Sequence, residues 1–225
     1  MQTPIYSITP FTLLDYPGKT ACIFWFAGCN MRCVYCYNPD IVLGKGRMSI
    51  AKALEFLRSR RGLLQGVVLS GGECTLHPTI FPLLEAAKGY GFSVKVDTNG
   101  SRPTVLKTLI AQQLVDYVAL DFKALERRYQ PITQSELFLQ FAESLALLNR
   151  SKVAFEVRTT VHSELITHDD LREMVGFLQE HAYKGTYYIQ HYVNGVPVLG
   201  TLGRSLRDEN PSALSLGDIQ VVERC

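Results

Sequence analysis

Runs of apolar and β-branched residues alternate, from residue 19 onward, with segments of helical periodicity. Each run ends in turn residues or polar groups, and this alternation is typical of repeated βα units with a parallel sheet. The sequence therefore predicts an α/β fold, a partial (βα)6 TIM-like barrel with parallel strands. The six predicted strands are Thr20–Phe26, Gly66–Ser70, Phe92–Asp97, Tyr117–Asp121, Val153–Val161 and Thr186–Tyr192.

Five helices are predicted between these strands. In each one, apolar residues recur three or four positions apart, which places them on a single face that packs against the sheet. Gly62 and Gly89 lie near the ends of the first two helices, as expected for helix termini. The apolar stripes are Ile50, Ala53, Leu54 and Leu57; Ile80, Leu83, Leu84 and Ala87; Val105, Leu106, Leu109 and Ile110; Phe138, Phe141, Leu145 and Leu148; and Leu171, Met174, Val175 and Leu178.

The chain of 225 residues has the length of one barrel domain with short appendages. Residues 1–18 are expected to form a lead-in hairpin, because Asp15-Tyr16-Pro17-Gly18 has the composition of a tight turn. The barrel domain is expected to span residues 19–192. Residues 193–225 lose the periodicity and are rich in turn residues, so the sequence predicts a tail with little regular structure.

The charge and cysteine patterns narrow the class of protein. The net charge of +2 comes from interspersed signs, so no basic block predicts binding to nucleic acid or to a membrane surface. Neither a secretory signal nor a bilayer-spanning apolar stretch is recognisable. Three of the six cysteines lie within eight positions, unlike a secreted disulfide framework, and we expect a cytoplasmic location.

Cys29, Cys33 and Cys36 place three thiols in one loop directly after the first predicted strand, and Gly28 precedes them. Thiolate groups of this kind bind soft metals or iron–sulfur clusters. Structural zinc takes four protein ligands, and no second cysteine pair or histidine pair lies at the usual spacing. Three cysteines suit a 4Fe-4S cluster whose fourth iron stays open to a substrate. A zinc site, a disulfide and buried structural thiols remain alternatives.

Polar or glycine residues also follow the other predicted strands, and barrel enzymes build their active sites at these carboxyl ends. Gly71 and Gly72 would let backbone approach a ligand closely, and Glu73 could accept a hydrogen bond from a ligand ammonium group. Asp97 and Asp121 could together bind a cation. Each segment taken alone is also a common turn or helix cap.

Two residues further along the chain could contact a ligand, and each also has a purely structural explanation. Arg158 on the fifth predicted strand could reach a ligand carboxylate or ribose, or it could pair with Glu156 at the surface. His191 closes the sixth predicted strand, where a lone histidine is commonly structural.

The pattern CxxxCxxC, with Tyr35 just before the last cysteine, resembles the signature of the radical S-adenosylmethionine superfamily. The resemblance implies one 4Fe-4S cluster on the three cysteines and cleavage of S-adenosylmethionine to a 5′-deoxyadenosyl radical. It implies cofactor contacts from Tyr35, Gly71, Gly72, Glu73, Asp97, Asn99, Arg158 and His191. In similarity to pyruvate formate-lyase activating enzymes, Asp97 and Asp121 would hold Na⁺ or K⁺, and Lys123 would act as a ligand-facing base or cation.

The segments Phe11–Lys19, Gly28-Cys29-Asn30 and Cys36-Tyr37-Asn38-Pro39 resemble the activating enzymes of glycyl-radical proteins. The chain is most similar to the activating proteins of anaerobic ribonucleoside-triphosphate reductase, although Tyr37 stands where these usually have histidine. This similarity implies a glycyl-radical protein as substrate and flavodoxin or ferredoxin as electron donor. No cysteine-rich inserts are present, as expected for an activator with one cluster.

Two other functions stay open. A radical enzyme acting on a metabolite, such as a 7-carboxy-7-deazaguanine synthase, would typically read Cys-Asp-Thr where this chain has Cys36-Tyr37-Asn38. An iron–sulfur electron carrier would normally use four cysteines. Of the remaining cysteines, Cys22 is expected in the core and Cys74 near the cofactor, while Cys225 is unassigned.

Overall fold

The computed structural model describes residues 3–206 and 211–224, which form two compact units. The first unit comprises the described residues of Met1–Asn30, Asn38–Thr98 and Thr104–Ala119. The second comprises those of Met31–Tyr37, Asn99–Pro103 and Leu120–Cys225. The boundary crosses the cysteine loop, so that Cys29 belongs to the first unit and Cys33 and Cys36 to the second.

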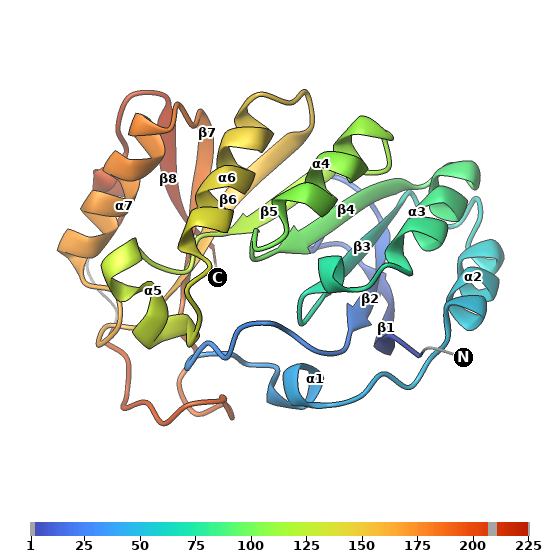
Figure 1. The fold of residues 1–225 in the computed structure, drawn as a ribbon, viewed down its shortest axis with the longest axis horizontal. Helices are drawn as coiled ribbons and strands as arrows, with labels where there is room; N and C mark the ends of the chain where they lie inside the picture. Colours follow the sequence, from blue (N-terminus) through green and yellow to red (C-terminus); the bar gives the residue numbers. More distant parts are fainter. Residues whose placement is uncertain (1–2, 207–210, 225) are drawn as a thin grey trace. The chain divides into compact units, whose positions relative to one another are not determined.

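The first unit contains four complete strands in chain order: β1 (Ile5–Thr12), β2 (Ala21–Phe26), β3 (Gly66–Gly71) and β4 (Ser93–Thr98) (Figure 1). β1 pairs antiparallel with β2, so residues 1–18 supply one strand of a hairpin whose other strand is β2. β2, β3 and β4 pair in parallel, and the residues at the centre of these strands are fully buried. Parallel strands are buried on both faces, which explains the continuous apolar runs of β2 and β3.

Helices connect the parallel strands of this unit. They are α1 (Pro39–Leu43), α2 (Ile50–Ser59), α3 (Ile80–Gly89) and α4 (Pro103–Ala111), with a short 3-10 helix η1 (Cys74–Leu76) after β3. α3 contacts both α2 and β4, and α2 and α3 can be followed beside the strands in Figure 1. The predicted apolar stripes of α2 and α3 supply the buried residues Ala53, Leu57, Ile80, Leu83, Leu84 and Ala87.

The second unit contains the end of β5 (Tyr117–Asp121), followed by β6 (Ala154–Val161), β7 (Gly185–His191) and β8 (Ile219–Arg224). β6, β7 and β8 pair in parallel. Its helices are α5 (Glu126–Thr133), α6 (Phe138–Asn149) and α7 (His168–Glu180), with a 3-10 helix η2 (Pro211–Leu214) before β8. Aromatic rings of Phe122, Phe141 and Phe177 contact one another in its core.

The structure confirms the predicted fold class. It differs from the prediction in the elements at the ends of the chain. The six predicted strands are β2 to β7, and the strands follow one another in chain order from β1 to β8. The prediction of an irregular tail was wrong, because Ile219–Arg224 forms β8 beside β7. Cys225 lies outside the described residues. No helix in the described ranges is long and apolar enough to cross a bilayer.

Candidate active site

The cysteine loop begins in the first unit, directly after β2. Gly28 turns the chain with a φ of +83°, a conformation that glycine adopts without a steric penalty. Its amide donates to the carbonyl of Ile41 (2.8 Å), and its carbonyl accepts from the amide of Glu73 (2.9 Å). These two bonds fix the peptide that precedes Cys29, a half-buried residue that forms no disulfide with a described cysteine.

Gly71 and Gly72 lie against this turn at the end of β3. A Cβ atom on Gly72 would come within 1.8 Å of the carbonyl oxygen of Gly28, and a Cβ atom on Gly71 within 2.5 Å of the backbone of Phe26. Both positions therefore require glycine so that the ends of β2 and β3 can pack. The predicted contact of these glycines with a ligand stays a prediction, and the structure adds a second reason for their identity.

Glu73 is fully buried and caps η1. Its Oε1 accepts hydrogen bonds from the Thr75 amide (3.1 Å), the Thr75 hydroxyl (2.5 Å) and the Thr98 hydroxyl (2.9 Å). A buried carboxylate needs such donors, since burial without them is costly. Sequence reasoning did not single out the two threonines, although Thr98 belongs to the polar stretch that follows β4. They hold Glu73 in one orientation.

Asp97 ends β4 beside two donors of the same unit. The ammonium group of Lys95 lies 2.5 Å from one carboxylate oxygen, and the hydroxyl of Ser70 lies 3.0 Å from the other. The Lys95 side chain is only 3% exposed, so the pair is shielded from solvent and its attraction is stronger than that of a surface pair. Asp97 is therefore already neutralised by a lysine.

In the second unit, Cys33 is buried and Cys36 is half-buried, and both thiols are free. Burial raises the pKa of Cys33 to about 11, although the nearby charge of Lys123 opposes the shift. Tyr35 is 3% exposed, and its hydroxyl has no hydrogen-bond partner among the residues that the structure describes. The ammonium nitrogen of Lys123 lies 6.0 Å from the centre of the Tyr35 ring, a cation–π contact.

Asp121, Lys123 and Arg158 form an ion-pair cluster at the end of β5, to which Arg158 projects from within β6. Arg158 Nε donates to one oxygen of Asp121, and Lys123 Nζ donates to the other at 2.9 Å. Burial alone would raise the pKa of Asp121, but the two cations outweigh it and lower this pKa to about 2. Asp121 in turn raises the pKa of Lys123 despite its burial, which favours a cation rather than a base at Lys123.

The structure gives Glu156, the predicted surface alternative for Arg158, another partner. Glu156 is only 2% exposed and accepts two hydrogen bonds from Arg224 on β8, at 2.8 and 3.0 Å. The sequence could not show this pairing, because β8 was not predicted. Arg158 points to the carboxylate at the end of the neighbouring strand.

Two further predicted residues have local partners. The side-chain oxygen of Asn99 accepts from the amide of Ser101 (2.9 Å), which closes the turn after β4 and leaves Gly100 with a φ of +73°. His191 Nε2 lies 3.1 Å from Glu223 on β8. Neither contact tests the predicted role of these residues in cofactor binding.

Replacing Asp121 with asparagine should destabilise the apoprotein by about 2 kcal/mol at pH 7, because a shift of the pKa from 3.8 to about 2 is worth this much. A depressed folded-state pKa stabilises the protein above the unfolded pKa, and this stabilisation is lost as the pH falls toward 2. The difference in unfolding free energy between wild type and Asp121→Asn should therefore be about halved at pH 3.

Guanidinium titrations at pH 7, 5 and 3 measure this difference. The matched control is Asp169→Asn, since Asp169 is 81% exposed and its ion pair with Arg172 is a surface pair of little value. A difference for Asp121→Asn that is the same at pH 7 and pH 3 would contradict the depressed pKa.

The predicted residues thus gather in two groups, one in each unit. The first unit holds Cys29, Gly71, Gly72, Glu73 and Asp97. The second holds Cys33, Tyr35, Cys36, Asn99, Asp121, Lys123, Arg158 and His191.

The donor set suits an iron–sulfur cluster better than a single metal ion. Among residues 3–206 and 211–224, no three His, Cys, Asp or Glu side chains converge as ligands of one ion. A 4Fe-4S cluster makes no such demand, because each thiolate binds a different iron. Cys29, Cys33 and Cys36 lie within eight residues of one loop and form no disulfide with a described residue, and the Tyr35 hydroxyl, which has no hydrogen-bond partner among the described residues, lies in the same loop. These residues fit a cluster.

The two described cysteines outside the cysteine loop have different surroundings from the three in it. Cys22 is fully buried in β2, and burial raises its pKa to about 12, which confirms the predicted core position. The Sγ of Cys74 faces the carbonyls of Leu69 and Asp97 at 3.9 and 3.5 Å. Cys74 is therefore a buried thiol held by the backbone of β3 and β4.

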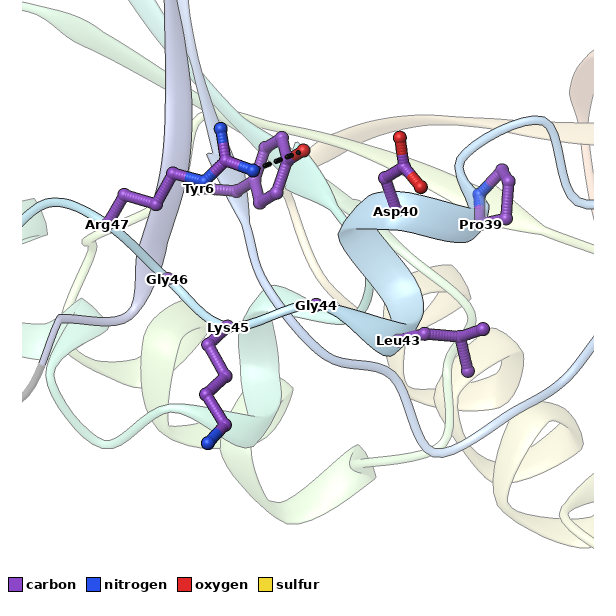
Figure 2. Close-up of a pocket in the computed structure, with 8 residues that line it drawn as sticks. All are labelled: Tyr6, Pro39, Asp40, Leu43, Gly44, Lys45, Gly46 and Arg47. Carbon is purple, nitrogen blue, oxygen red and sulfur yellow. Dashed lines mark hydrogen bonds between the residues drawn. The ribbon is translucent and has the colours of Figure 1, made fainter.

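A hollow of about 610 Å³ beside α1 lies outside the predicted set. Figure 2 shows that its lining side chains diverge: Arg47 stacks on Tyr6, while Lys45 and Leu43 point away from them. Binding sites use polar groups that converge. We therefore do not assign this hollow to the active site.

The chain also matches known proteins. The model of the radical SAM superfamily matches residues 23–178, which include most of β2, the cysteine loop and every strand from β3 to β6. The chain belongs to the radical SAM superfamily. Membership implies a 4Fe-4S cluster and S-adenosylmethionine, and it makes this radical SAM protein an enzyme.

A protein of Methanocaldococcus jannaschii, predicted to be a glycyl-radical enzyme activating enzyme, is 30% identical over 184 residues, which cover 77% of this chain and 75% of that protein. The pyruvate formate-lyase-activating enzyme of Clostridium pasteurianum is 34% identical over 103 residues, 43% of each chain. A 7-carboxy-7-deazaguanine synthase of Haemophilus influenzae is 35% identical over 108 residues, 48% of this chain and 46% of that protein. The first two confirm the predicted resemblance to activating enzymes.

Among solved structures, Streptococcus suis SuiB bound to S-adenosylmethionine superposes with a TM-score of 0.68 at 13% identity. The match covers 90% of this radical SAM protein but only 52% of SuiB, so the chain spans about half the length of that structure. This likeness shows that the two share a fold.

Proposed function

We propose that this radical SAM enzyme installs a glycyl radical on a partner protein. The observation that carries the proposal is the spacing of Cys29, Cys33 and Cys36, which is that of the superfamily to which the chain belongs. Resemblance to activating enzymes over three quarters of the chain supports the choice of a protein substrate.

The three cysteines would hold the cluster, which supplies one electron to S-adenosylmethionine when both are bound. The remaining residues would orient the cofactor. Gly71 and Gly72 would bring backbone close to it, and Glu73, fixed by Thr75 and Thr98, would face its ammonium group. Lys123 and Arg158 would supply positive charge for its carboxylate or ribose, with Asp121 holding both cations in place.

The proposed reaction uses one electron and transfers one hydrogen atom. One electron from a reduced flavodoxin or ferredoxin breaks the C5′–S bond of S-adenosylmethionine and yields methionine and a 5′-deoxyadenosyl radical. That radical takes one hydrogen atom from the Cα of a glycine in the partner. The products are 5′-deoxyadenosine and a glycyl radical. None of the five described cysteines forms a disulfide with another described residue, which supports a reducing, cytoplasmic setting.

The partner we propose is an anaerobic ribonucleoside-triphosphate reductase, on the resemblance of the cysteine loop and lead-in segment to its activating proteins. The test mixes the reconstituted enzyme with the reductase, S-adenosylmethionine and a reductant under anaerobic conditions. We expect the doublet signal of a glycyl radical in electron paramagnetic resonance (EPR) spectra. A reductase with its radical glycine changed to alanine is the control. Absence of the signal, with cofactor cleavage intact, would exclude this partner.

A second candidate is a radical enzyme that acts on a metabolite, which the similarity to a 7-carboxy-7-deazaguanine synthase over nearly half of the chain favours. The two candidates differ in what the adenosyl radical attacks. An assay for 7-carboxy-7-deazaguanine, the product that the name of this relative gives, separates them. Product formation would favour the second candidate, whereas a glycyl radical on a protein would favour the first.

We also propose that Asp97 and Asp121 contribute to a Na⁺ or K⁺ site beside the cofactor, on the similarity to pyruvate formate-lyase activating enzymes. Each carboxylate already faces a lysine, so a cation would compete with these ammonium groups. Asp97→Ala should weaken S-adenosylmethionine binding and leave the iron content unchanged. Affinities of the wild type and the variant measured in potassium and sodium buffers test this, and an affinity that Asp97→Ala leaves unchanged in both would argue against the cation site.

A further inference from the structure

The part of the cysteine loop that belongs to the second unit forms backbone hydrogen bonds along both of its edges. On one edge, the amides of Arg32 and Val34 donate to the carbonyls of Thr133 and Ile132 at the end of α5 (2.8 and 3.0 Å). On the other edge, the amides of Leu199 and Gly200 donate to the carbonyls of Cys36 and Val34 (3.2 and 2.8 Å). The backbone around Cys33 is thereby held between two segments that are far apart in sequence.

The second of these segments, residues 193–204, belongs to the tail that the sequence left without a role; we call it the strap. Gly200 fits against the loop only as glycine, because a Cβ atom there would lie 2.8 Å from the carbonyl oxygen of Val34. The strap is anchored beyond the loop as well. His162 Nε2 lies 3.1 Å from the carbonyl of Gly203, and Asn194 exchanges two hydrogen bonds with the backbone of Ser205 (2.8 and 3.0 Å).

Tyr37 joins the loop to the start of the strap. Its hydroxyl accepts a hydrogen bond from the amide of Val193 (2.6 Å), and its ring stacks on Tyr192 with centroids 5.5 Å apart. Tyr192 in turn meets the edge of His162 at 4.6 Å. Tyr37 directly follows Cys36 and is the position at which the chain departs from the usual histidine. A tyrosine can reach the strap through both its ring and its hydroxyl.

From this geometry we infer that Tyr37 and the strap position the cysteine loop for its cluster. Tyr37 is a positioning residue, since it acts on Cys36 and Cys33 through the backbone. The strap holds the loop in the conformation in which its thiols would bind the cluster. The inference rests on the proposed function, because it takes the cysteines to be the cluster ligands.

The test measures how fast the reconstituted enzyme loses iron to an excess of the chelator bathophenanthroline under anaerobic conditions. Tyr37→Phe keeps the ring and removes the acceptor of the Val193 amide, so iron release should become about fivefold faster. Tyr37→Ala also removes the ring contact, and release should be about thirtyfold faster. The EPR spectrum of the reduced cluster should change in the alanine variant, which a role in global folding alone would not cause.

Tyr6→Phe is the matched control, because it likewise removes a hydroxyl that accepts one hydrogen bond, from Arg47 in the first unit. Its release rate should equal that of the wild type. Gly200→Ala should accelerate release as Tyr37→Ala does. If Gly200→Ala does not fold, hydrogen exchange of the Leu199 and Gly200 amides in the wild type decides instead, and slow exchange is expected.

Wild-type rates and spectra in Tyr37→Ala, or rapid exchange of those two amides, would overturn the role of the strap while leaving the proposed function intact. A wild-type protein that takes up no cluster at all would overturn both.

Discussion

Replacing Cys29, Cys33 or Cys36 with alanine, one at a time, should abolish the cleavage of S-adenosylmethionine. Each change removes the ligand of one iron. No other cysteine among the described residues can take its place, because Cys22 and Cys74 are fully buried in the core of the first unit. Iron content, the absorbance of the cluster and the yield of 5′-deoxyadenosine measure the effect.

Cys22→Ala is the control for these variants. It removes a thiol of the same kind from the core of β2, so it should cost some stability and leave the cluster and the cleavage intact. Undiminished turnover in any one of the three loop variants would remove that cysteine from the ligand set. Loss of the cluster in Cys22→Ala as well would mean that the assay reports stability rather than ligation.

The second large effect is expected for Gly72→Ala. Its Cβ atom would lie 1.8 Å from the carbonyl oxygen of Gly28, so either the end of β3 or the peptide before Cys29 must move. Both atoms belong to the backbone, and overpacking of this kind typically costs 1–3 kcal/mol. We expect cluster uptake to fall about tenfold or more, because the displaced peptide carries the first ligand.

Gly176→Ala is the matched glycine variant. Gly176 lies inside α7 with no atom within 4 Å of its added Cβ, so alanine should stabilise the helix slightly and leave cluster uptake unchanged. Normal uptake in Gly72→Ala would show that the contact between β3 and the turn at Gly28 does not position Cys29.

The fold was largely predictable, because each central strand and helix carries its own periodicity. The apolar runs of β2 to β7 and the stripes of α2, α3, α4, α6 and α7 are local signals. β8 carries a weaker one: only Ile219 and Val221 are buried, in a short strand that follows a turn-rich segment. Its place beside β7 depends on pairing with a distant strand, which periodicity does not encode.

The residues of the predicted site were also found from local sequence signals. Their hydrogen-bond and ion-pair partners in the structure could not be found in this way. Cys29, Cys33 and Cys36 are recognisable from spacing alone. The pairing of Arg158 with Asp121, and of Glu156 with Arg224, joins residues 37 and 68 positions apart. The contact of Tyr37 with Val193 spans 156 positions. Contacts of this kind depend on strand order and on the path of the tail, so they become visible only in the structure.

The central claim is that this chain cleaves S-adenosylmethionine by reduction. The most direct test is anaerobic reconstitution with iron and sulfide, reduction with dithionite, and chromatography for 5′-deoxyadenosine and methionine. The account predicts both products from the wild type, in equal amounts, and neither from Cys36→Ala. A wild-type protein that carries a reduced cluster and leaves S-adenosylmethionine intact, with the partner protein present as well as absent, would contradict it and would indicate an electron-transfer protein.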